Sequence, residues 1–334
     1  MTRAGRLCAA VTDSLPPVGD GGPARATKKG LLPDHPLTAT AARFDLFDVG
    51  APPGSGWQPL ASALDPAWTA ARVDRLARGG EHGPRPRAAA GAFLAGDLAW
   101  VVAVPVTAAV LTERRCPDVA IGNVAIRVDD EGWSTRMALL APRFAALPGD
   151  ADAGSEDATV VDGLPGLVDH TAELLVATFT PVFASARRAS PFGTSGMWGL
   201  LADHVSAVLW ALRERGASPA ELGQAWRDVE QLVDALQRQA PRLRARSRLF
   251  RFDGGGTVPP VELPMRGTCC LYDKAPESRA AGGDGLCTTC PRRPDGERIR
   301  LVDEHLRRQA TAAAGAAASD PTPSTDPSAG PGDD

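Results

Sequence analysis

The sequence of 334 residues contains few lysines, few cysteines and no long apolar run. Lysine occurs only at Lys28, Lys29 and Lys274, so arginine supplies most of the positive charge, and the formal net charge is -4. The arginines are scattered among acidic residues and form no basic patch along the chain. We therefore expect no nucleic-acid partner.

Apolar segments are too short for export or for a membrane span. The basic amino terminus is followed by about five apolar residues in a row, whereas a secretory signal core needs about 7–15. The most apolar window, Leu98 to Leu111, is interrupted by Pro105 and falls short of the roughly 18–20 residues that cross a bilayer. It predicts a pair of buried helices. We expect a cytoplasmic protein without a transmembrane segment, for which peripheral membrane association stays open.

Motifs for several kinds of catalysis are missing. No G-x-G-x-x-G follows an expected strand, and neither an H-E-x-x-H pattern nor a convincing catalytic triad occurs. We therefore expect no nicotinamide or flavin bound by this chain.

Periodicity predicts a mainly helical α+β fold with a small antiparallel hairpin. Residues 87–112 have helical spacing, with a bend or stop expected at Pro105. Alternating residues in 124–128, a turn and a second extended stretch predict the hairpin. Residues 164–239 are mostly helical: one helix is expected from an N-cap at Ser195 to Gly216, and the next from a capping box at Ser218.

Four of the six cysteines lie within 22 residues, at Cys269, Cys270, Cys287 and Cys290. Disulfides, a structural zinc and an iron–sulfur cluster are the three explanations. Reduced cytosolic thiols disfavour disulfides. Zinc ribbons usually present two C-x-x-C knuckles, and only Cys287 and Cys290 have that form.

Adjacent cysteines favour a centre larger than one ion. The Cα atoms of neighbouring residues are ~3.8 Å apart, and their side chains tend to diverge. Four thiolates are the ligand set of a 2Fe-2S or 4Fe-4S cluster. Glycines at 282, 283 and 285 would let the intervening loop return toward the first pair.

The stretch "RGTCCLYDKAPESRAAGGDGLCTTCPRR" resembles the carboxy-terminal signature of the FhuF-type ferric siderophore reductases. In that family a vicinal Cys-Cys, a spacer of about ten residues and a Cys-x-x-Cys-Pro hold a 2Fe-2S cluster. The stretches "AGAFLAGDLAWVVAVPVTAAVL" and "SGMWGLLADHVSAVL" resemble its helices more weakly. The spacer here is longer, sixteen residues from Leu271 to Leu286, and we expect a surface bulge with an intact site because loop-closure cost rises slowly with length.

The resemblance implies a cytosolic one-electron reductase. Its substrate would be a ferric siderophore, its cofactor a 2Fe-2S cluster on the four cysteines, and its electron donor a separate ferredoxin or a flavin- or NAD(P)H-dependent reductase. A zinc-stabilised binding module and an iron–sulfur relay or sensor are the rival interpretations.

The same interpretation divides the chain into four parts. Expected are a poorly ordered segment at 1–40, a siderophore-accepting body at 41–245, a cluster-binding segment at 246–312 and a disordered tail at 313–334.

Other candidate residues have a simpler structural explanation. The histidines 170, 204 and 305 have no paired ligand at helical spacing, and the tryptophans 198, 210 and 226 occupy expected core positions. Cys116 is expected to be an inert buried thiol, and Cys8 has no nearby partner. Arg187 and Arg188 precede a helix start that favours anions, although a solvated turn explains them as well.

Overall fold

The computed structural model describes residues 35–38, 41, 47–50, 54–79, 82–280 and 284–319. The fold is mainly helical α+β, as expected. Its helices are α3 (Pro66–Arg78), α4 (Arg87–Glu113), α5 (Gly163–Ala189), α6 (Thr194–Glu214), α7 (Pro219–Gln239), α8 (Pro276–Ala280) and α9 (Asp295–Ser319), with 3-10 turns η1 (Leu60–Leu64) and η2 (Tyr272–Lys274). Cys8 and glycines 282 and 283 lie outside the described residues.

The strands form three small sheets. The largest has the order β1-β5-β4-β2, with β1 (Phe47–Val49), β2 (Trp57–Pro59), β4 (Val124–Val128) and β5 (Ser134–Leu139). The expected hairpin is β4–β5 and is confirmed. The sheet around it is mixed, because β1 pairs with β5 in parallel. A second sheet contains β3 (Arg115–Pro117), β6 (Phe144–Ala146) and β7 (Ala158–Val160).

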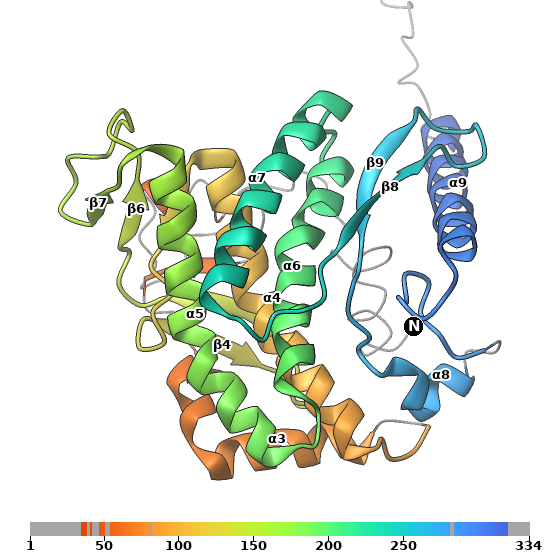
Figure 1. Cartoon of the computed structure of the whole chain (residues 1–334), viewed down its shortest axis with the longest axis horizontal. Helices are drawn as coiled ribbons and strands as arrows, with labels where there is room; N and C mark the ends of the chain where they lie inside the picture. Colours follow the sequence, from red (N-terminus) through yellow and green to blue (C-terminus); the bar gives the residue numbers. More distant parts are fainter. Residues whose placement is uncertain are drawn as a thin grey trace, which may run out of the picture.

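Helix α4 is the centre of the helical body. Every residue from Ala89 to Val110 except Trp100 is buried, and α3, α5 and α6 pack around the helix (Figure 1). Within the described residues, α4 is the one helix long and apolar enough to cross a membrane, and 89% of its apolar window is buried inside the molecule.

Pro105 does not end this helix. The expected pair of helices is wrong, because α4 is continuous through the proline. A helix-interior proline costs about 3 kcal/mol. Burial of each large apolar side chain contributes about 1.5–3 kcal/mol, and α4 buries several on each side of Pro105. Tertiary packing therefore overrides the local preference.

The starts and ends of α6 and α7 follow capping chemistry. Helix α6 begins at Thr194 with Gly193 as its N-cap, so the expected cap at Ser195 is wrong. Its expected end is confirmed: Gly216 has a φ of 84°, and its N–H donates to the Arg213 carbonyl while the next N–H reaches Leu212, a Schellman motif. The capping box at Ser218 is also confirmed.

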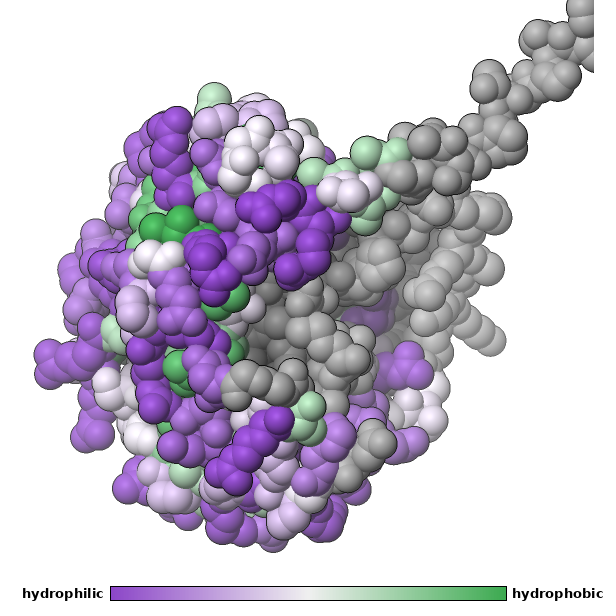
Figure 2. Space-filling view, turned by 90° about the vertical axis from the view of Figure 1, so that its right-hand side faces the viewer, coloured by the Kyte–Doolittle hydropathy of each residue, from purple (hydrophilic) through white to green (hydrophobic). Residues whose placement is uncertain are grey.

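The carboxy-terminal elements lie together on one side of the helical body (Figure 1). Strands β8 (Arg248–Phe252) and β9 (Val261–Met265) form an antiparallel hairpin. Trp210 of α6 packs on Phe252 and donates from its indole nitrogen to the Pro264 carbonyl at 2.8 Å. Helix α9 continues to Ser319 and so includes the first residues of the segment expected as a tail. The described residues on this face are mostly hydrophilic, with small separate apolar spots (Figure 2).

A buried ion pair joins α3, α4 and β5. Asp97 accepts from the Arg72 guanidinium at 3.1 Å and from the Ser134 hydroxyl at 2.6 Å. The side chains of Arg72 and Asp97 are 6% and 2% exposed. If one of the two were removed, water could not solvate the charge of the other.

We expect Asp97→Ala to lower the free energy of unfolding by about 3–5 kcal/mol, because it leaves the buried Arg72 charge uncompensated. Urea denaturation followed by circular dichroism measures this. Asp74→Ala is the matched control: it removes an exposed partner of Arg87 and should cost less than about 1 kcal/mol. Equal losses in the two variants would contradict the assignment.

Candidate functional site: four cysteines against helix α6

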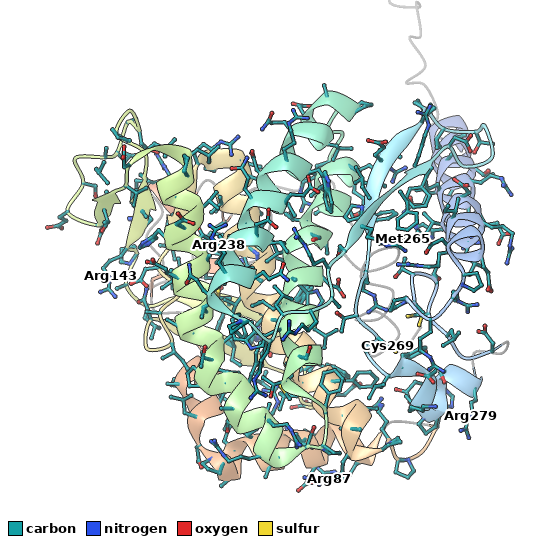
Figure 3. The ribbon with its side chains drawn as sticks, viewed as in Figure 1. Arg87, Arg143, Arg238, Met265, Cys269 and Arg279 are labelled. Carbon is teal, nitrogen blue, oxygen red and sulfur yellow. The ribbon has the colours of Figure 1, made fainter. Side chains whose placement is uncertain are left out.

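The four clustered cysteines meet between the end of β9 and the start of α9. Cys269 and Cys270 follow β9, and Cys287 and Cys290 lie in the loop before α9. Cys270, Cys287 and Cys290 are 5%, 8% and 2% exposed, whereas Cys269 is half-buried and lies where this segment faces the body (Figure 3). The prediction that distant cysteines are brought together is thus confirmed, and Cys269 is the sulfur nearest to solvent.

Hydrogen bonds link the four sulfurs in a chain. Cys269 bonds to Cys290, Cys290 to Cys287, and Cys287 to Cys270. The pKa of the Cys290 thiol lies far below its ordinary value because Cys269 and Cys287 both donate to its sulfur. The pKa of Cys269 is raised, chiefly by its bond to Cys290 and by burial, and the pKa of Cys287 is raised, chiefly by its bonds to Cys270 and Cys290 and by burial.

These cysteines are free thiols, so the disulfide explanation does not hold in this structure. Among the residues that the structure describes, no group of three or more His, Cys, Asp or Glu side chains is arranged to hold a metal ion. The sulfur-to-sulfur contacts are the observation on which the site rests.

Two buried arginines lie beside the sulfurs. Arg266 follows β9 and donates from Nη2 to Cys287 Sγ at 2.7 Å. Arg298 of α9 donates to the Arg266 carbonyl at 2.7 Å. Arg266 and Arg298 are only 4% and 2% exposed. Buried cations need nearby negative charge or acceptors, and Arg266 has the Asp203 carboxylate and the Cys287 sulfur beside it.

Asp203 of α6 holds the backbone just before Cys269. Its Oδ1 accepts from the Gly267 N–H at 2.8 Å and from the Ser247 hydroxyl at 2.9 Å, and its Oδ2 accepts from the Thr268 N–H at 2.9 Å. Burial raises the pKa of Asp203 to about 6, while the three donors and the Arg266 charge act in the opposite direction. One carboxylate therefore ties together α6, the coil before β8 and the cysteine loop.

Two glycines allow a close approach at this contact. A Cβ at Gly199 of α6 would lie 2.1 Å from the Thr268 hydroxyl oxygen, and a Cβ at Gly267 would lie 2.1 Å from the Arg246 carbonyl oxygen. Neither contact is sterically allowed. The helix, the coil and the cysteine loop thus pack at the distance that only glycine permits.

The turn after the vicinal cysteines is also unusual. Leu271 has a φ of 59°, in the left-handed region that non-glycine residues rarely adopt. It reverses the chain directly into η2, whose residues Tyr272 and Lys274 lie near the site. Of the glycines expected to help the loop return, Gly285 has a φ of 72°.

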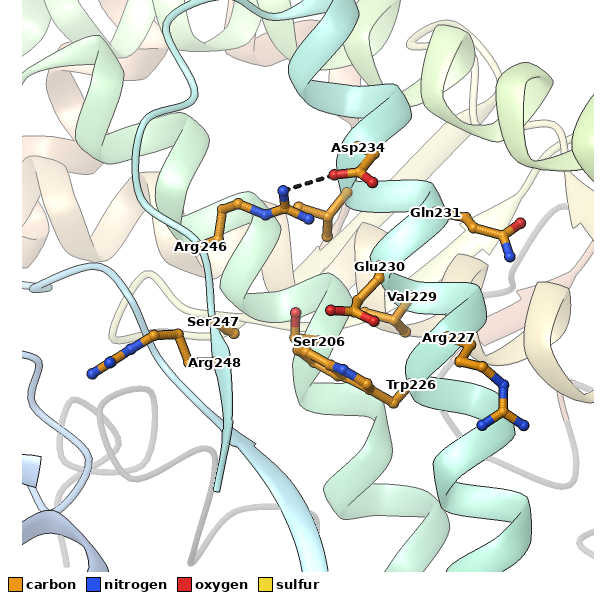
Figure 4. A pocket seen from close by; sticks show the side chains of 11 residues that line it. Ser206, Trp226, Arg227, Val229, Glu230, Gln231, Asp234, Arg246, Ser247 and Arg248 are labelled. Atoms are coloured by element: carbon orange, nitrogen blue, oxygen red, sulfur yellow. Dashed lines mark ion pairs between the residues drawn. The ribbon is translucent and has the colours of Figure 1, made fainter. Parts of the chain in front are cut away.

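A groove lies beside the coil that leads into β8. It is a cavity of about 560 Å³ between α7, α6 and residues 246–248. Trp226 and Glu230 reach into it from α7, toward Ser206 and Ser247 (Figure 4). Trp226 also lines a second cavity of about 290 Å³ between α7 and the β8–β9 hairpin.

The residues around the four cysteines could accommodate a metal ion or iron–sulfur cluster held by cysteine sulfurs. Four cysteines are the number of ligands that such a centre needs. Arg266 would compensate its charge. The hydroxyl of Thr289, inside the C-x-x-C pair, is buried and has no hydrogen-bond partner within the described chain, so it is available to a further acceptor at this place. By its chemistry a set of four cysteines is compatible with a structural zinc as well as with a 2Fe-2S or 4Fe-4S cluster.

Other predicted candidates have different surroundings. Trp198 and Trp210 are core residues as expected, whereas Trp226 is only half-buried. His170 is half-buried on α5, and His305 is buried on α9. Cys116 is fully buried and its pKa is raised to about 12 by burial. Arg187 donates to the Ser190 carbonyl, which stabilises the turn before α6.

His204 lies closer to the site than its sequence context indicates. It is 4% exposed. Burial and the positive charge of Arg266 lower its pKa to about 3, while Cys270 acts the other way. The imidazole is therefore neutral at physiological pH.

Sequence reasoning missed Arg266 and Asp203 as site residues. Arg266 belongs to the quoted cysteine stretch, but nothing in the spacing shows that its side chain reaches Cys287. Asp203 offers a signal: with His204 it forms the one polar pair in the apolar stretch from Met197 to Val205. Buried carboxylates in apolar helices usually have designated partners.

We expect Gly199→Ala to loosen the cysteine loop although alanine is the better helix former. The new methyl group would overlap Thr268, and such overpacking costs about 1–3 kcal/mol. Labelling of the buried thiols by a thiol reagent should therefore become about tenfold faster or more, through easier local opening. Gly223→Ala on α7 is the control, since its Cβ would meet only Arg227 Nη1 at 3.8 Å. Unchanged labelling in Gly199→Ala would show that this contact does not hold the loop.

Comparison of the chain with protein-family models gives no match, and comparison with curated proteins gives none. The functional argument therefore rests on the cysteine stretch and on the geometry around it.

Proposed function

We propose that the chain is a cytoplasmic ferric siderophore reductase that holds a 2Fe-2S cluster on Cys269, Cys270, Cys287 and Cys290. The single observation that carries this proposal is the chain of sulfur contacts joining two cysteine pairs separated by sixteen residues. The resemblance of the cysteine stretch to the FhuF-type reductases supports it. The longer spacer was expected to form a surface bulge, but part of it is buried: Glu277 and Ser278 of α8 are 4% and 1% exposed, and Glu277 pairs with Arg85.

A bound 2Fe-2S cluster would supply one electron at a time. One electron is enough for iron release, because hydroxamate and catecholate oxygens are hard ligands that hold Fe(III) much more tightly than Fe(II). The electron would come from a separate ferredoxin or a flavin- or NAD(P)H-dependent reductase. Peripheral attachment near an importer is compatible with this role.

The chain's own residues would hold, shield and orient the centre. Cys270, Cys287 and Cys290 are buried, so they would keep water from most of it. Cys269 is half-buried and would form the side open to donor or substrate. Asp203 would fix the loop relative to α6 through the N–H groups of Gly267 and Thr268.

The groove beside Trp226 is the proposed place for the ferric chelate. Its volume of about 560 Å³ is within the range of ~300–1,000 Å³ typical of small-molecule sites. The coil that forms one wall touches the cysteine loop where Gly267 packs on the Arg246 backbone. Ser247, in the same wall, and Thr268 both donate hydrogen bonds to the Asp203 carboxylate. A chelate in the groove would thus be separated from the cysteine loop by a single stretch of backbone.

We expect anaerobically purified protein to be red-brown, with about two irons and two sulfides per chain, and to bleach with dithionite. Cys270→Ser should lose the colour and the iron because it removes one ligand. Cys116→Ser is the control: Cys116 is buried in β3 and belongs to the other part of the molecule, so its iron content should match the wild type. A colourless wild type containing one zinc per chain would overturn the proposal.

We expect Trp226→Ala to raise the KM for a ferric trihydroxamate about three- to tenfold, since aromatic contacts contribute about 0.5–1.5 kcal/mol beyond their buried area. The absorption spectrum and kcat should stay unchanged, because the cysteines are not touched. Trp226→Phe keeps an aromatic ring and should recover most of the loss. An unchanged KM in Trp226→Ala would place the chelate elsewhere while leaving the cluster assignment intact.

A further inference from the structure

The contact between Arg266 and Cys287 is the most specific feature of the site that the proposed function does not use. The guanidinium Nη2 lies 2.7 Å from Cys287 Sγ. The contact is charge-assisted, because the guanidinium carries a full positive charge. Both residues are buried, Arg266 at 4% and Cys287 at 8% exposure. Water therefore does not screen the interaction.

The position of Arg266 is fixed by elements on both sides. It directly follows β9, and its carbonyl accepts from Arg298 of α9 at 2.7 Å. Arg293 donates to the carbonyls of Cys287 and Leu286, at 3.1 and 2.7 Å. The backbones of Arg266 and Cys287 are thus each held by their own hydrogen bonds. These bonds keep the guanidinium and the sulfur next to each other.

The charges around the Arg266 guanidinium do not fully compensate its positive charge, which therefore acts on the sulfurs. Asp203 is the carboxylate that interacts with it, and Asp203 already accepts three hydrogen bonds from other groups. The guanidinium of Arg298 is ion-paired with Asp295 at 3.2 Å, and burial lowers the pKa of His204 to about 3, so its imidazole is neutral. Arg266 acts on both Cys287 and Cys290. Any centre bound to these sulfurs would therefore experience positive charge from this side.

We propose, resting on the proposed cluster, that Arg266 raises the reduction potential of the centre through Cys287 and thereby limits which ferric chelates the protein can reduce. Reduction adds one negative charge, and a buried cation hydrogen-bonded to a ligand sulfur stabilises the more negative state. Arg266 does not touch the substrate. By raising the reduction potential, Arg266 would make reduction of the centre by the donor more favourable and reduction of the ferric chelate less favourable.

The test is a spectroscopic redox titration of purified wild-type, Arg266→Met and Arg266→Lys proteins at one pH. Arg266→Met should shift the midpoint to more negative potential, with at least a tenfold change in the one-electron equilibrium, which corresponds to 59 mV. Arg266→Lys keeps the charge without the planar donor and should fall between. The matched control is Arg292→Met: Arg292 also interacts with a cysteine, Cys269, but its side chain is 50% exposed, so solvent should reduce its effect severalfold.

A midpoint in Arg266→Met equal to that of the wild type would overturn the inference and leave the proposed function standing. A wild-type protein without iron and sulfide would remove both. If the Arg266 variants do not assemble, pulsed EPR of the reduced wild type grown with ¹⁵N-arginine decides the matter. A nitrogen coupling from the bound guanidinium is expected, and its absence would also overturn the inference.

Discussion

Helix α4 has no polar face, and the other helices of the body must therefore cover it from every side. Its burial extends from Ala89 to Val110 with Trp100 as the exception. An apolar helix of this kind loses its driving force for folding if one side is left in water. This requirement keeps α6 close against α4, and α6 in turn carries the residues that receive the cysteine segment. The position of the site thus depends on the packing of a helix that contributes no residue to it.

The cysteine segment shares the apolar core of the body, and polar contacts fix its orientation. Asp203 accepts three donors from the coil and the loop, and Gly199 allows Thr268 to approach α6. Among the apolar contacts, Trp210 packs on Phe252, and Leu263 and Met265 of β9 belong to the same core. The directional hydrogen bonds of Asp203 fix the position of the loop relative to α6.

Local chemistry in the sequence was sufficient to predict several features. The capping box at Ser218, the stop at Gly216 and the β4–β5 hairpin each depend on residues within a few positions of one another. The grouping of the cysteines could also be anticipated from their spacing. Pro105 was misleading because its cost is outweighed by contacts that come from other helices. The roles of Asp203 and Arg266 could not be derived, since Asp203 and Gly267 are 64 residues apart and only the folded arrangement brings them together.

The uneven burial of the four sulfurs has a consequence for chemical durability. Oxidants and alkylating agents must reach a sulfur before they can modify it. Cys270, Cys287 and Cys290 are at most 8% exposed, whereas Cys269 is half-buried. An agent arriving from solvent therefore meets Cys269 first and reaches the other three only when the loop opens. The packing of the cysteine loop against α6 thus shields three of the four cysteines from covalent damage.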